Sequence, residues 1–368
     1  MKLFCSQKDL DNALNIVNKA ISPNNTLPVL NNILIKAEGK RLYFSSTNLE
    51  IAISCSIEAD VRNEGSITVP AKLITNYISL VTDEKVEISV VEGGNLSINS
   101  STSHTKVKCI SADEFPLIPK IEKDQEFIVK TEDLHKAIDE TVFAASVNTS
   151  RPVLSGVFIT SKPDGLKLVA TDSYRLAERG LSLVKASSTE VSCIVPARTM
   201  IEVSKIITKL NEKEVMVNIS KNQILFSAGD VEVISRLIDG KFPDYEKIIP
   251  KEHKTKFEVS VEDLSLVLKR VSLFARENNN SVKLDVSSDG KLEVSSDETK
   301  VGEEKAEVLI KIDGENNKIS LNSQYLLDVL NYVDDEKITF SINDKVSPAL
   351  IKPLKREDYS YIIMPLKV

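Results

Sequence analysis

The sequence is poor in the residues on which many enzymes and secreted proteins depend. Its 368 residues include no tryptophan, three histidines and four cysteines, and aromatic residues make up 5%. Cys5, Cys55, Cys109 and Cys193 are scattered, without the paired spacing of a zinc site or a redox couple. We therefore expect four buried, reduced thiols and a reducing compartment, the cytoplasm.

Long apolar runs are also missing. No stretch approaches the ~20 residues of a membrane span, and residues 1–7 contain no apolar segment long enough for a signal peptide. We expect no membrane partner. The histidines, His104, His135 and His253, belong to no nucleophile, metal or phosphate motif. The sequence thus predicts a protein that is not an enzyme and that holds no cofactor and no metal.

One polar cluster could still suggest catalysis, namely Asp172, Tyr174 and Arg175. An aspartate in a turn at a strand edge is far more often a turn residue than a catalytic one. The overall composition favours a binding protein, with 42% hydrophobic and 27% charged residues. The net charge of −7 argues against indiscriminate nucleic-acid binding by the whole surface, although a local basic face remains compatible with it.

The chain repeats one pattern three times. Each copy opens on a similar segment ending in Asp-Leu, at Ser6–Leu10, Lys130–Leu134 and Ser260–Leu264. A second marker follows in each copy, at Val69–Ala71, Val195–Ala197 and Leu321–Ser323. A copy that extends from one opening segment to the next is long enough to be a whole domain and is much longer than a solenoid repeat. We predict three domains, over residues 1–122, 123–251 and 252–368.

Each copy predicts the same two helices. The first is apolar at the i, i+3, i+4, i+7 positions that give one buried stripe. The stripe positions are Leu10, Ala13, Leu14, Val17, Ala20 and Ile21, then Leu134, Ala137, Ile138, Thr141, Ala144 and Ala145, then Leu264, Val267, Leu268, Val271, Phe274 and Ala275. Ser6 and Ser260 suit N-terminal caps. The second helices are predicted over Ala71–Val81, Ala197–Leu210 and Ser323–Val333.

Alternating apolar residues after the second helices predict strands, as at Val86, Ile88 and Val90. The fold class is therefore α+β, with three repeated domains that each pack two helices on an antiparallel sheet.

Repetition would place six helices together. If helices about 8–10 Å apart lined a ring, six would leave a hole of under about 10 Å and twelve a hole of about 25–30 Å. The groove depths of a DNA duplex alone sum to about 16 Å. Two chains closed head to tail could therefore enclose a duplex, and one chain could not.

Three motifs resemble the beta subunit of bacterial DNA polymerase III. They are Thr171–Ala177 (TDSYRLA), Phe242–Pro250 (FPDYEKIIP) and Tyr361–Val368 (YIIMPLKV), and Thr26–Leu30 (TLPVL) also fits. The resemblance covers the whole chain. It implies the DNA clamp fold, with two chains closing a ring, and a non-catalytic sliding clamp that encircles duplex DNA without sequence specificity. It also implies as partners the alpha subunit of DNA polymerase III, the clamp loader and other proteins with a clamp-binding motif.

The resemblance also implies a pocket that receives the partners' short hydrophobic motif. Its residues here are Leu154, Thr171, Ser173, Tyr174, Arg175, Leu176, Pro243, Lys247, Ile248, Val346, Ile362, Met364, Pro365 and Leu366. Such aliphatic and methionine side chains make an adaptable apolar cleft, while Arg175 and Lys247 offer polar edges. Ser173 and Tyr174 stand where part of the family has Gly-His, and Pro348 replaces a small polar residue.

For the ring joint, the resemblance implies that Leu273 and Phe274 of one chain meet Thr105 and Val107 of the other. For the DNA channel, it implies Lys72, Arg198, Lys205 and Lys209. Asn24 stands where some relatives carry an arginine. Contacts from lysine and arginine to phosphate carry no sequence information, as sliding requires. The alternative hypothesis is a non-catalytic peptide-binding scaffold that does not enclose DNA.

Overall fold

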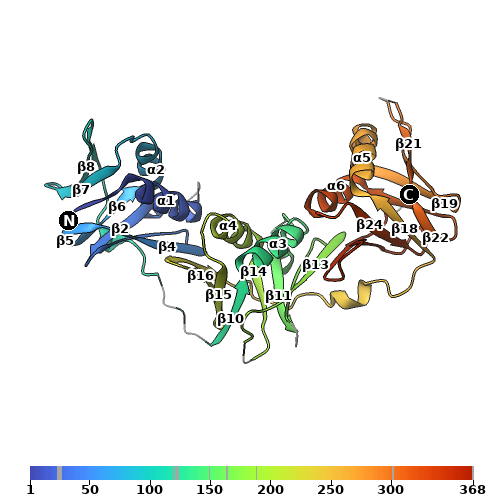
Figure 1. The fold of residues 1–368 in the computed structure, drawn as a ribbon, viewed down its shortest axis with the longest axis horizontal. Coiled ribbons are helices and arrows are strands. Elements are labelled where there is room, and N and C mark those ends of the chain that lie inside the picture. Colours follow the sequence, from blue (N-terminus) through green and yellow to red (C-terminus); the bar gives the residue numbers. More distant parts are fainter. Residues whose placement is uncertain are drawn as a thin grey trace. The chain divides into compact units, whose positions relative to one another are not determined.

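The computed structural model describes residues 1–22, 27–118, 121, 124–148, 150–162, 165–187, 189–300 and 302–366. The chain divides into two compact units (Figure 1). Unit 1 comprises Met1–Glu132, Val184–Thr189 and Glu202–Leu237, and unit 2 comprises Asp133–Leu183, Glu190–Ile201 and Ile238–Val368. Each unit therefore combines segments from more than one of the sequence repeats.

Unit 1 contains two antiparallel sheets with the strand orders β5-β1-β7-β8-β9 and β10-β15-β16-β17-β4-β3-β2-β6. The strands are β1 (Lys2–Ser6), β2 (Asn32–Glu38), β3 (Arg41–Thr47), β4 (Ile51–Glu58), β5 (Asp60–Asn63), β6 (Gly65–Pro70), β7 (Lys85–Val91), β8 (Asn95–Asn99), β9 (His104–Val107), β10 (Gln125–Lys130), β15 (Glu214–Ile219), β16 (Gln223–Ala228) and β17 (Val231–Arg236). The larger sheet is continuous because β17 pairs with β4, with Val231 opposite Cys55 and Ser235 opposite Ile51.

Unit 2 contains sheets with the orders β14-β11-β12-β13-β26-β25-β24-β18-β22 and β21-β20-β19-β23. The strands are β11 (Gly156–Lys162), β12 (Gly165–Thr171), β13 (Arg175–Leu181), β14 (Ser192–Pro196), β18 (Thr255–Ser260), β19 (Ser281–Ser287), β20 (Lys291–Ser296), β21 (Lys305–Leu309), β22 (Lys311–Gly314), β23 (Asn317–Asn322), β24 (Lys337–Ile342), β25 (Ala349–Pro353) and β26 (Tyr359–Ile363). Here β13 pairs with β26, with Arg175 opposite Ile363 and Arg179 opposite Tyr359.

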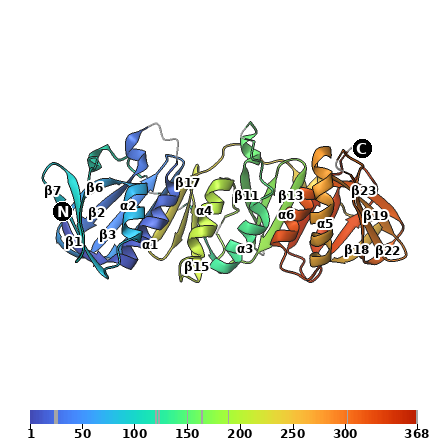
Figure 2. The same ribbon diagram turned by 90° about the horizontal axis from the view of Figure 1, so that it is seen from above.

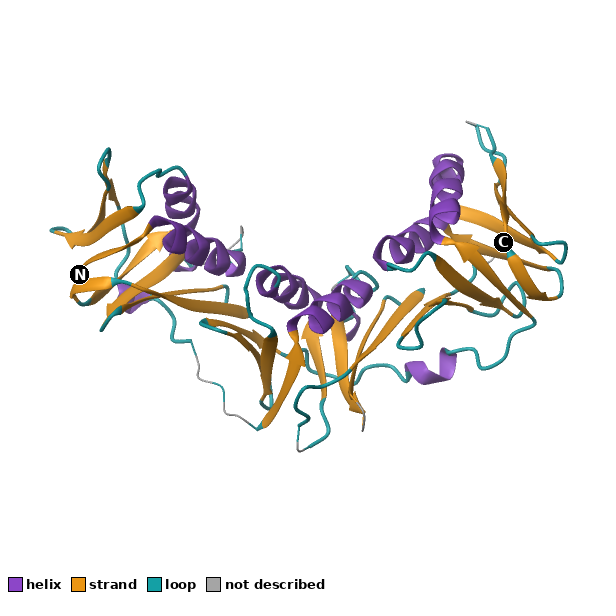
Figure 3. Cartoon of the chain, viewed as in Figure 1, coloured by secondary structure: helices purple, strands orange, loops and turns teal. Residues whose placement is uncertain are grey.

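The helices are α1 (Gln7–Val17), α2 (Ala71–Ser79), α3 (Thr131–Val142), α4 (Ala197–Ile207), α5 (Val261–Ala275) and α6 (Ser323–Tyr332). Helix α1 lies against β3 and β4 in unit 1, and α5 lies against β19 and β20 in unit 2; Figure 3 shows the helices and strands in different colours. Helix α1 packs beside α2 in unit 1, and α5 packs beside α6 in unit 2 (Figure 2). The short 3₁₀ turns are η1 (Asn18–Ala20), η2 (Pro28–Asn31), η3 (Ala112–Glu114), η4 (Pro152–Leu154), η5 (Tyr245–Ile248) and η6 (Arg276–Asn278).

The predicted apolar stripes supply the helix cores. Leu14 and Val17 of α1 and Leu268 of α5 are fully buried, which is why these polar-faced segments fold as helices on the sheets. The predicted stripes were wrong in detail at their ends. Ala20 and Ile21 lie beyond α1, which ends at Val17, and Ala144 and Ala145 lie beyond α3, which ends at Val142. Phe274 lies within α5 but is only half-buried, because it lies toward the edge of the stripe.

The predicted ends of the second helices were also too late. Helices α2, α4 and α6 end at Ser79, Ile207 and Tyr332. After α2, the N–H groups of Leu80 and Val81 bond to carbonyl oxygens three residues back, both at 3.1 Å. This tighter bonding closes the helix in a 3₁₀-type turn, which apolar periodicity cannot distinguish from another helical turn.

Side-chain caps begin several helices. The Ser6 hydroxyl accepts the N–H of Asp9 at 3.4 Å, and the Ser260 hydroxyl accepts the N–H of Asp263 at 3.2 Å. Asn322, in the least similar of the three second markers, caps α6 by accepting the N–H of Gln324 at 2.9 Å. Each cap satisfies an N–H group that the helix leaves unbonded.

The cysteines are all free thiols. Burial raises the pKa of Cys5, Cys55 and Cys193 to about 12, so these three stay protonated. Cys109 is only half-buried, and the expectation of four buried thiols was wrong for it. It follows the end of β9 at Val107 and lies outside the sheet.

An ion network around the buried Glu140 joins α3 and β13 to the segments that precede β24 and β26 in unit 2. Glu140 is 1% exposed, forms an ion pair with Arg179 at 2.7 Å and accepts a hydrogen bond from Arg356 at 2.6 Å. Arg356 also pairs with Asp335 at 3.2 Å, and Arg179 pairs with Asp358. Buried charges of this kind are stable only while each keeps its partner.

Glu140→Gln should therefore destabilise unit 2 strongly. The amide has nearly the shape of the carboxyl group but leaves two arginines near it without its charge, and we expect a loss of about 3–5 kcal/mol in the free energy of unfolding. Urea denaturation measures this loss. Glu262→Gln, at an exposed position in the first turn of α5, is the matched control, and equal losses in the two variants would contradict the argument.

Candidate functional site

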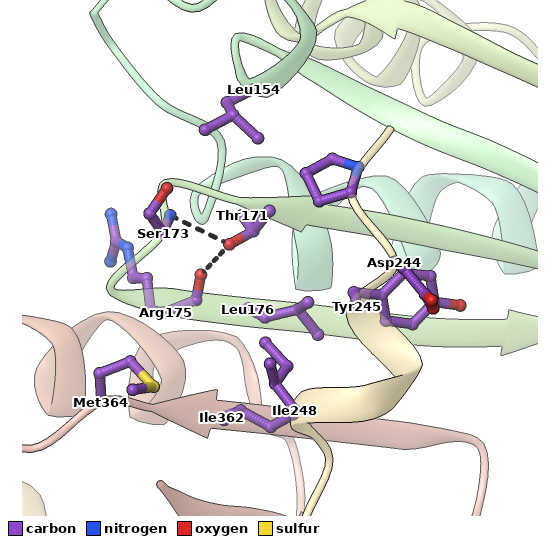
Figure 4. A pocket seen from close by; sticks show the side chains of 11 residues that line it. Leu154, Thr171, Ser173, Arg175, Leu176, Asp244, Tyr245, Ile248, Ile362 and Met364 are labelled. Atoms are coloured by element: carbon purple, nitrogen blue, oxygen red, sulfur yellow. Dashed lines mark hydrogen bonds between the residues drawn. The ribbon is translucent and has the colours of Figure 1, made fainter. Parts of the chain in front are cut away.

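An apolar pocket in unit 2 gathers residues from four segments (Figure 4). The pocket together with its solvent-open mouth encloses about 480 Å³. Its lining residues are Leu154, Thr171, Ser173, Arg175, Leu176, Pro243, Asp244, Tyr245, Ile248, Ile362 and Met364. Leu176 and Ile362 are each 1% exposed and belong to one buried cluster with Tyr245. The pocket floor is therefore part of the unit's core, and such a floor holds its shape when a ligand enters.

The turn between β12 and β13 forms one wall. The Asp172 carboxylate accepts the N–H groups of Tyr174 at 2.9 Å and Arg175 at 3.0 Å. The Thr171 hydroxyl accepts the N–H of Ser173 at 3.1 Å and donates to the carbonyl of Arg175 at 2.6 Å. The Thr-Asp pair thus replaces strand hydrogen bonds with its own and fixes the turn.

Ser173 lies in the left-handed region, with a φ of 81°. A residue with a side chain in this conformation costs of order 1–3 kcal/mol, which the surrounding hydrogen bonds must offset. Its hydroxyl faces the rim of the pocket (Figure 4) and accepts a hydrogen bond from Arg151 at 3.3 Å. A glycine, which the resemblance noted above implies as an alternative at this position, would carry no such strain and no such hydroxyl.

Arg175 contributes its stem to the pocket, while its guanidinium group is already paired. The group contacts Asp172 at 3.1 Å and Asp328 at 2.5 Å, and it lies 4.4 Å from the ring centre of Tyr325. Burial alone would lower the pKa of Arg175, but Tyr361 and the two carboxylates outweigh it and raise the pKa. The guanidinium group is therefore a fixed, charged part of the wall.

The remaining residues expected at the pocket lie around it or away from the cavity. Tyr174 and Val346 are 63% and 70% exposed, and Lys247 is exposed and paired with Asp244 at 2.5 Å. Pro365 and Leu366 are half-buried beyond the lining. Nine of the fourteen expected residues line the cavity. The structure adds Asp244 and Tyr245, which the motif Phe242–Pro250 contained but which had no assigned role.

The residues expected at the ring joint differ in exposure. Leu273 is 56% exposed, whereas Val107 is only 3% exposed. Thr105 is half-buried and its hydroxyl donates to Tyr77 at 3.0 Å. Phe274 is half-buried.

The four basic residues expected at DNA, Lys72, Arg198, Lys205 and Lys209, are all exposed on or just after the second helices. Lys205 pairs with Glu202 at 3.1 Å. Asn24 lies outside the described residues.

Within the described ranges, no group of three or more His, Cys, Asp and Glu residues is placed to hold a metal ion. No helix in the described part of the chain is both long and apolar enough to cross a membrane.

The structure is an α+β protein with an apolar pocket in unit 2, and comparison with known proteins shows its family. Models of the N-terminal, central and C-terminal domains of the DNA polymerase III beta subunit match residues 1–119, 128–244 and 246–367. The beta sliding clamp of Staphylococcus aureus is 31% identical over 96% of each chain, and that of Synechocystis is 28% identical over the full length of both.

Solved structures agree. The DNA polymerase sliding clamp of Bacillus subtilis is 30% identical with a TM-score of 0.95, covering 100% of this chain and 99% of that one. The DNA polymerase III beta subunit of Thermotoga maritima is 30% identical with a TM-score of 0.94, at the same coverage. The chain belongs to the DNA polymerase III beta subunit family, and its three-domain clamp fold is confirmed.

Asp172→Ala should open the pocket wall. The change removes the acceptor of two backbone N–H groups, and we expect a loss of about 2 kcal/mol in the free energy of unfolding. Asp172→Asn keeps an acceptor oxygen and should lose about half as much. Urea denaturation of both variants provides the measurement, and equal losses would show that the charge, rather than the turn bonding, matters.

Proposed function

We propose that this chain is a non-catalytic DNA sliding clamp. Two copies close head to tail into a ring around duplex DNA, and the apolar pocket tethers the replicative polymerase. Membership of the beta subunit family over the whole chain supports the clamp role. The observation that supports a ring of two chains is the strand pairing by which the chain's own repeats are joined.

Each repeat contains two meanders of three strands. Where two repeats share a sheet, the third strand of a meander in one repeat pairs with the third strand of a meander in the next. Strand β17 ends the meander β15-β16-β17 and pairs with β4, which ends β2-β3-β4. Strand β26 ends β24-β25-β26 and pairs with β13, which ends β11-β12-β13. Two corresponding strands are left at sheet ends in the described structure. They are β9, which ends β7-β8-β9, and β21, which ends β19-β20-β21.

By this equivalence, β9 of one chain pairs with β21 of another. An open strand edge presents unpaired N–H and C=O groups that favour such addition. Because each chain has one edge of each kind, association is heterologous and can close with two copies. Leu309 on β21 is 82% exposed and Leu273 on α5, which packs against β21, is 56% exposed. These side chains, with Phe274, Thr105 and Val107, form the proposed joint.

Lys72, Arg198, Lys205 and Lys209 are proposed to face the DNA. Phosphate contacts from lysine and arginine position a protein on a duplex without reading its bases. On binding DNA, Lys205 would leave its ion pair with Glu202 and pair with a phosphate group instead. The partners proposed for the pocket are the alpha subunit of DNA polymerase III, the clamp loader and other proteins with a short apolar motif. The three buried free thiols fit a cytoplasmic location. The domain boundaries 122/123 and 251/252 stay proposals.

Leu273→Asp should give a monomer. The aspartate would place an unpaired charge in an apolar contact, which is strongly destabilising. Size-exclusion chromatography with light scattering should show a mass falling from twice 40.7 kDa to 40.7 kDa. Val184→Asp, at a partly exposed aliphatic position (47%) away from the joint, should remain a dimer. An unchanged mass for Leu273→Asp would refute the placement.

Retention on DNA tests the clamp itself. Loaded by purified clamp loader onto nicked circular DNA, the protein should stay bound and should escape after the circle is cut, because a ring leaves only over an end. Gel filtration of labelled protein before and after cutting measures this. Equal retention on both forms would favour the peptide-binding scaffold that never encloses DNA.

A further inference from the structure

A second cavity lies in unit 1, at the join of β4 and β17. Together with its solvent-open mouth it encloses about 450 Å³, and the pocket in unit 2, counted in the same way, encloses about 480 Å³. The residues that give the second cavity its character are Leu49, Ile51, Leu117, Ile118, Ile234 and Arg236. All of the residues that line it belong to unit 1.

The turn that forms its wall repeats the turn of the first pocket. The Asn48 side chain accepts the N–H groups of Glu50 at 3.0 Å and Ile51 at 2.9 Å. The Thr47 hydroxyl accepts the N–H of Leu49 at 2.9 Å and donates to the carbonyl of Ile51 at 2.9 Å. These are the four hydrogen bonds that Thr171 and Asp172 make in the other turn.

The third residue of this turn is strained in the same way. Leu49 has a φ of 74°, as Ser173 has one of 81°. A leucine in the left-handed region is unusual, because its bulky side chain crowds the backbone there. The conformation also holds Leu49 47% exposed at the cavity, where a buried position would have been favoured by the hydrophobic effect.

The floors of the two cavities correspond as well. Ala52 and Ile234 form a buried cluster against which Ile118 packs, as Leu176 and Ile362 do with Tyr245. The N–H of Arg236 bonds to the carbonyl of Glu50 at 2.9 Å, and the N–H of Met364 bonds to the carbonyl of Tyr174 at 2.8 Å.

Arg236 therefore stands where the first pocket has Met364. It is exposed, and the described part of the chain places no ion-pair partner on it. Glu50, in the place of Tyr174, is the single acidic residue among those that line the cavity. Leu117 beside it is 97% exposed. The second cavity thus combines exposed apolar side chains with one available guanidinium group, which favours a ligand that has both an apolar side chain and a carboxylate.

We propose that this cavity is a second peptide-binding site, which takes an extended segment with a leucine-like anchor next to one acidic residue. The inference rests on the proposed function, because the peptide class comes from the repeat-related pocket. Arg236 pairs with the acidic side chain, and the apolar wall of Leu49 and Leu117 covers the anchor. The clamp then has two peptide sites per chain that differ in charge preference.

Photocrosslinking of the full-length protein tests both sites at once. The probe is the end-blocked peptide Gly-Leu-Asp-Leu-Gly with photoleucine at both leucine positions, and a second probe has lysine in place of the aspartate. Mass spectrometry identifies the crosslinked segments. We expect the aspartate probe to label residues 47–52 or 116–118 in unit 1 as well as the pocket in unit 2.

Arg236→Glu removes a charged hydrogen bond to the aspartate probe, and labelling of unit 1 by that probe should fall about tenfold or more. The new carboxylate should raise labelling of unit 1 by the lysine probe, because it can pair with the lysine side chain. Labelling in unit 2 should not change. Lys40→Glu, at an exposed position in the β2–β3 turn of the same unit, should leave both sites as they are.

Labelling of unit 2 alone would overturn this proposal and leave the proposed function standing. Unit 1 labelling that is insensitive to Arg236→Glu would also overturn it. Labelling at neither site would overturn both the second site and the peptide-binding role of the first.

Discussion

Hydrogen bonding between strand edges is the constraint on which this structure depends. Each repeat on its own would end its sheets in bare N–H and C=O groups, which are costly to bury and invite association. Pairing of β17 with β4 and of β26 with β13 satisfies two pairs of edges within the chain. It also explains why the compact units do not follow the sequence repeats, since each continuous sheet takes strands from two of them.

At both strand pairs, β17 with β4 and β26 with β13, a turn of the same conformation lines a cavity. Thr-Asn-Leu at 47–49 and Thr-Asp-Ser at 171–173 make equivalent hydrogen bonds and put their third residue at positive φ. The backbone thus needs only a threonine followed by an Asx side chain. The side chains that line each cavity are free to differ, so one backbone device supports two cavities of different chemistry.

Buried ion pairs in unit 2 join residues that are far apart in the sequence and that meet only in the folded protein. Glu140 lies on α3 and, as a glutamate, belongs to a residue type that is rarely fully buried, yet it is buried between Arg179 and Arg356. Arg175 is similar, because Asp328, far away in sequence, neutralises it at 2.5 Å. Such partners come together only when the sheet across β13 and β26 forms, and no local pattern marks them.

The sequence by itself determined the threefold repeat, the α+β class and the apolar stripes of the helices, because these depend on local periodicity and on capping by residues such as Ser6 and Ser260. Its motifs also pointed to nine residues that line the pocket. Only the tertiary structure decided that Val107 is buried and Leu273 exposed, that the guanidinium group of Arg175 is paired, and that Leu49 and Arg236 share a cavity. Burial and pairing between distant segments depend on which strands join, and strand joining is a property of the folded sheet rather than of any local stretch of sequence.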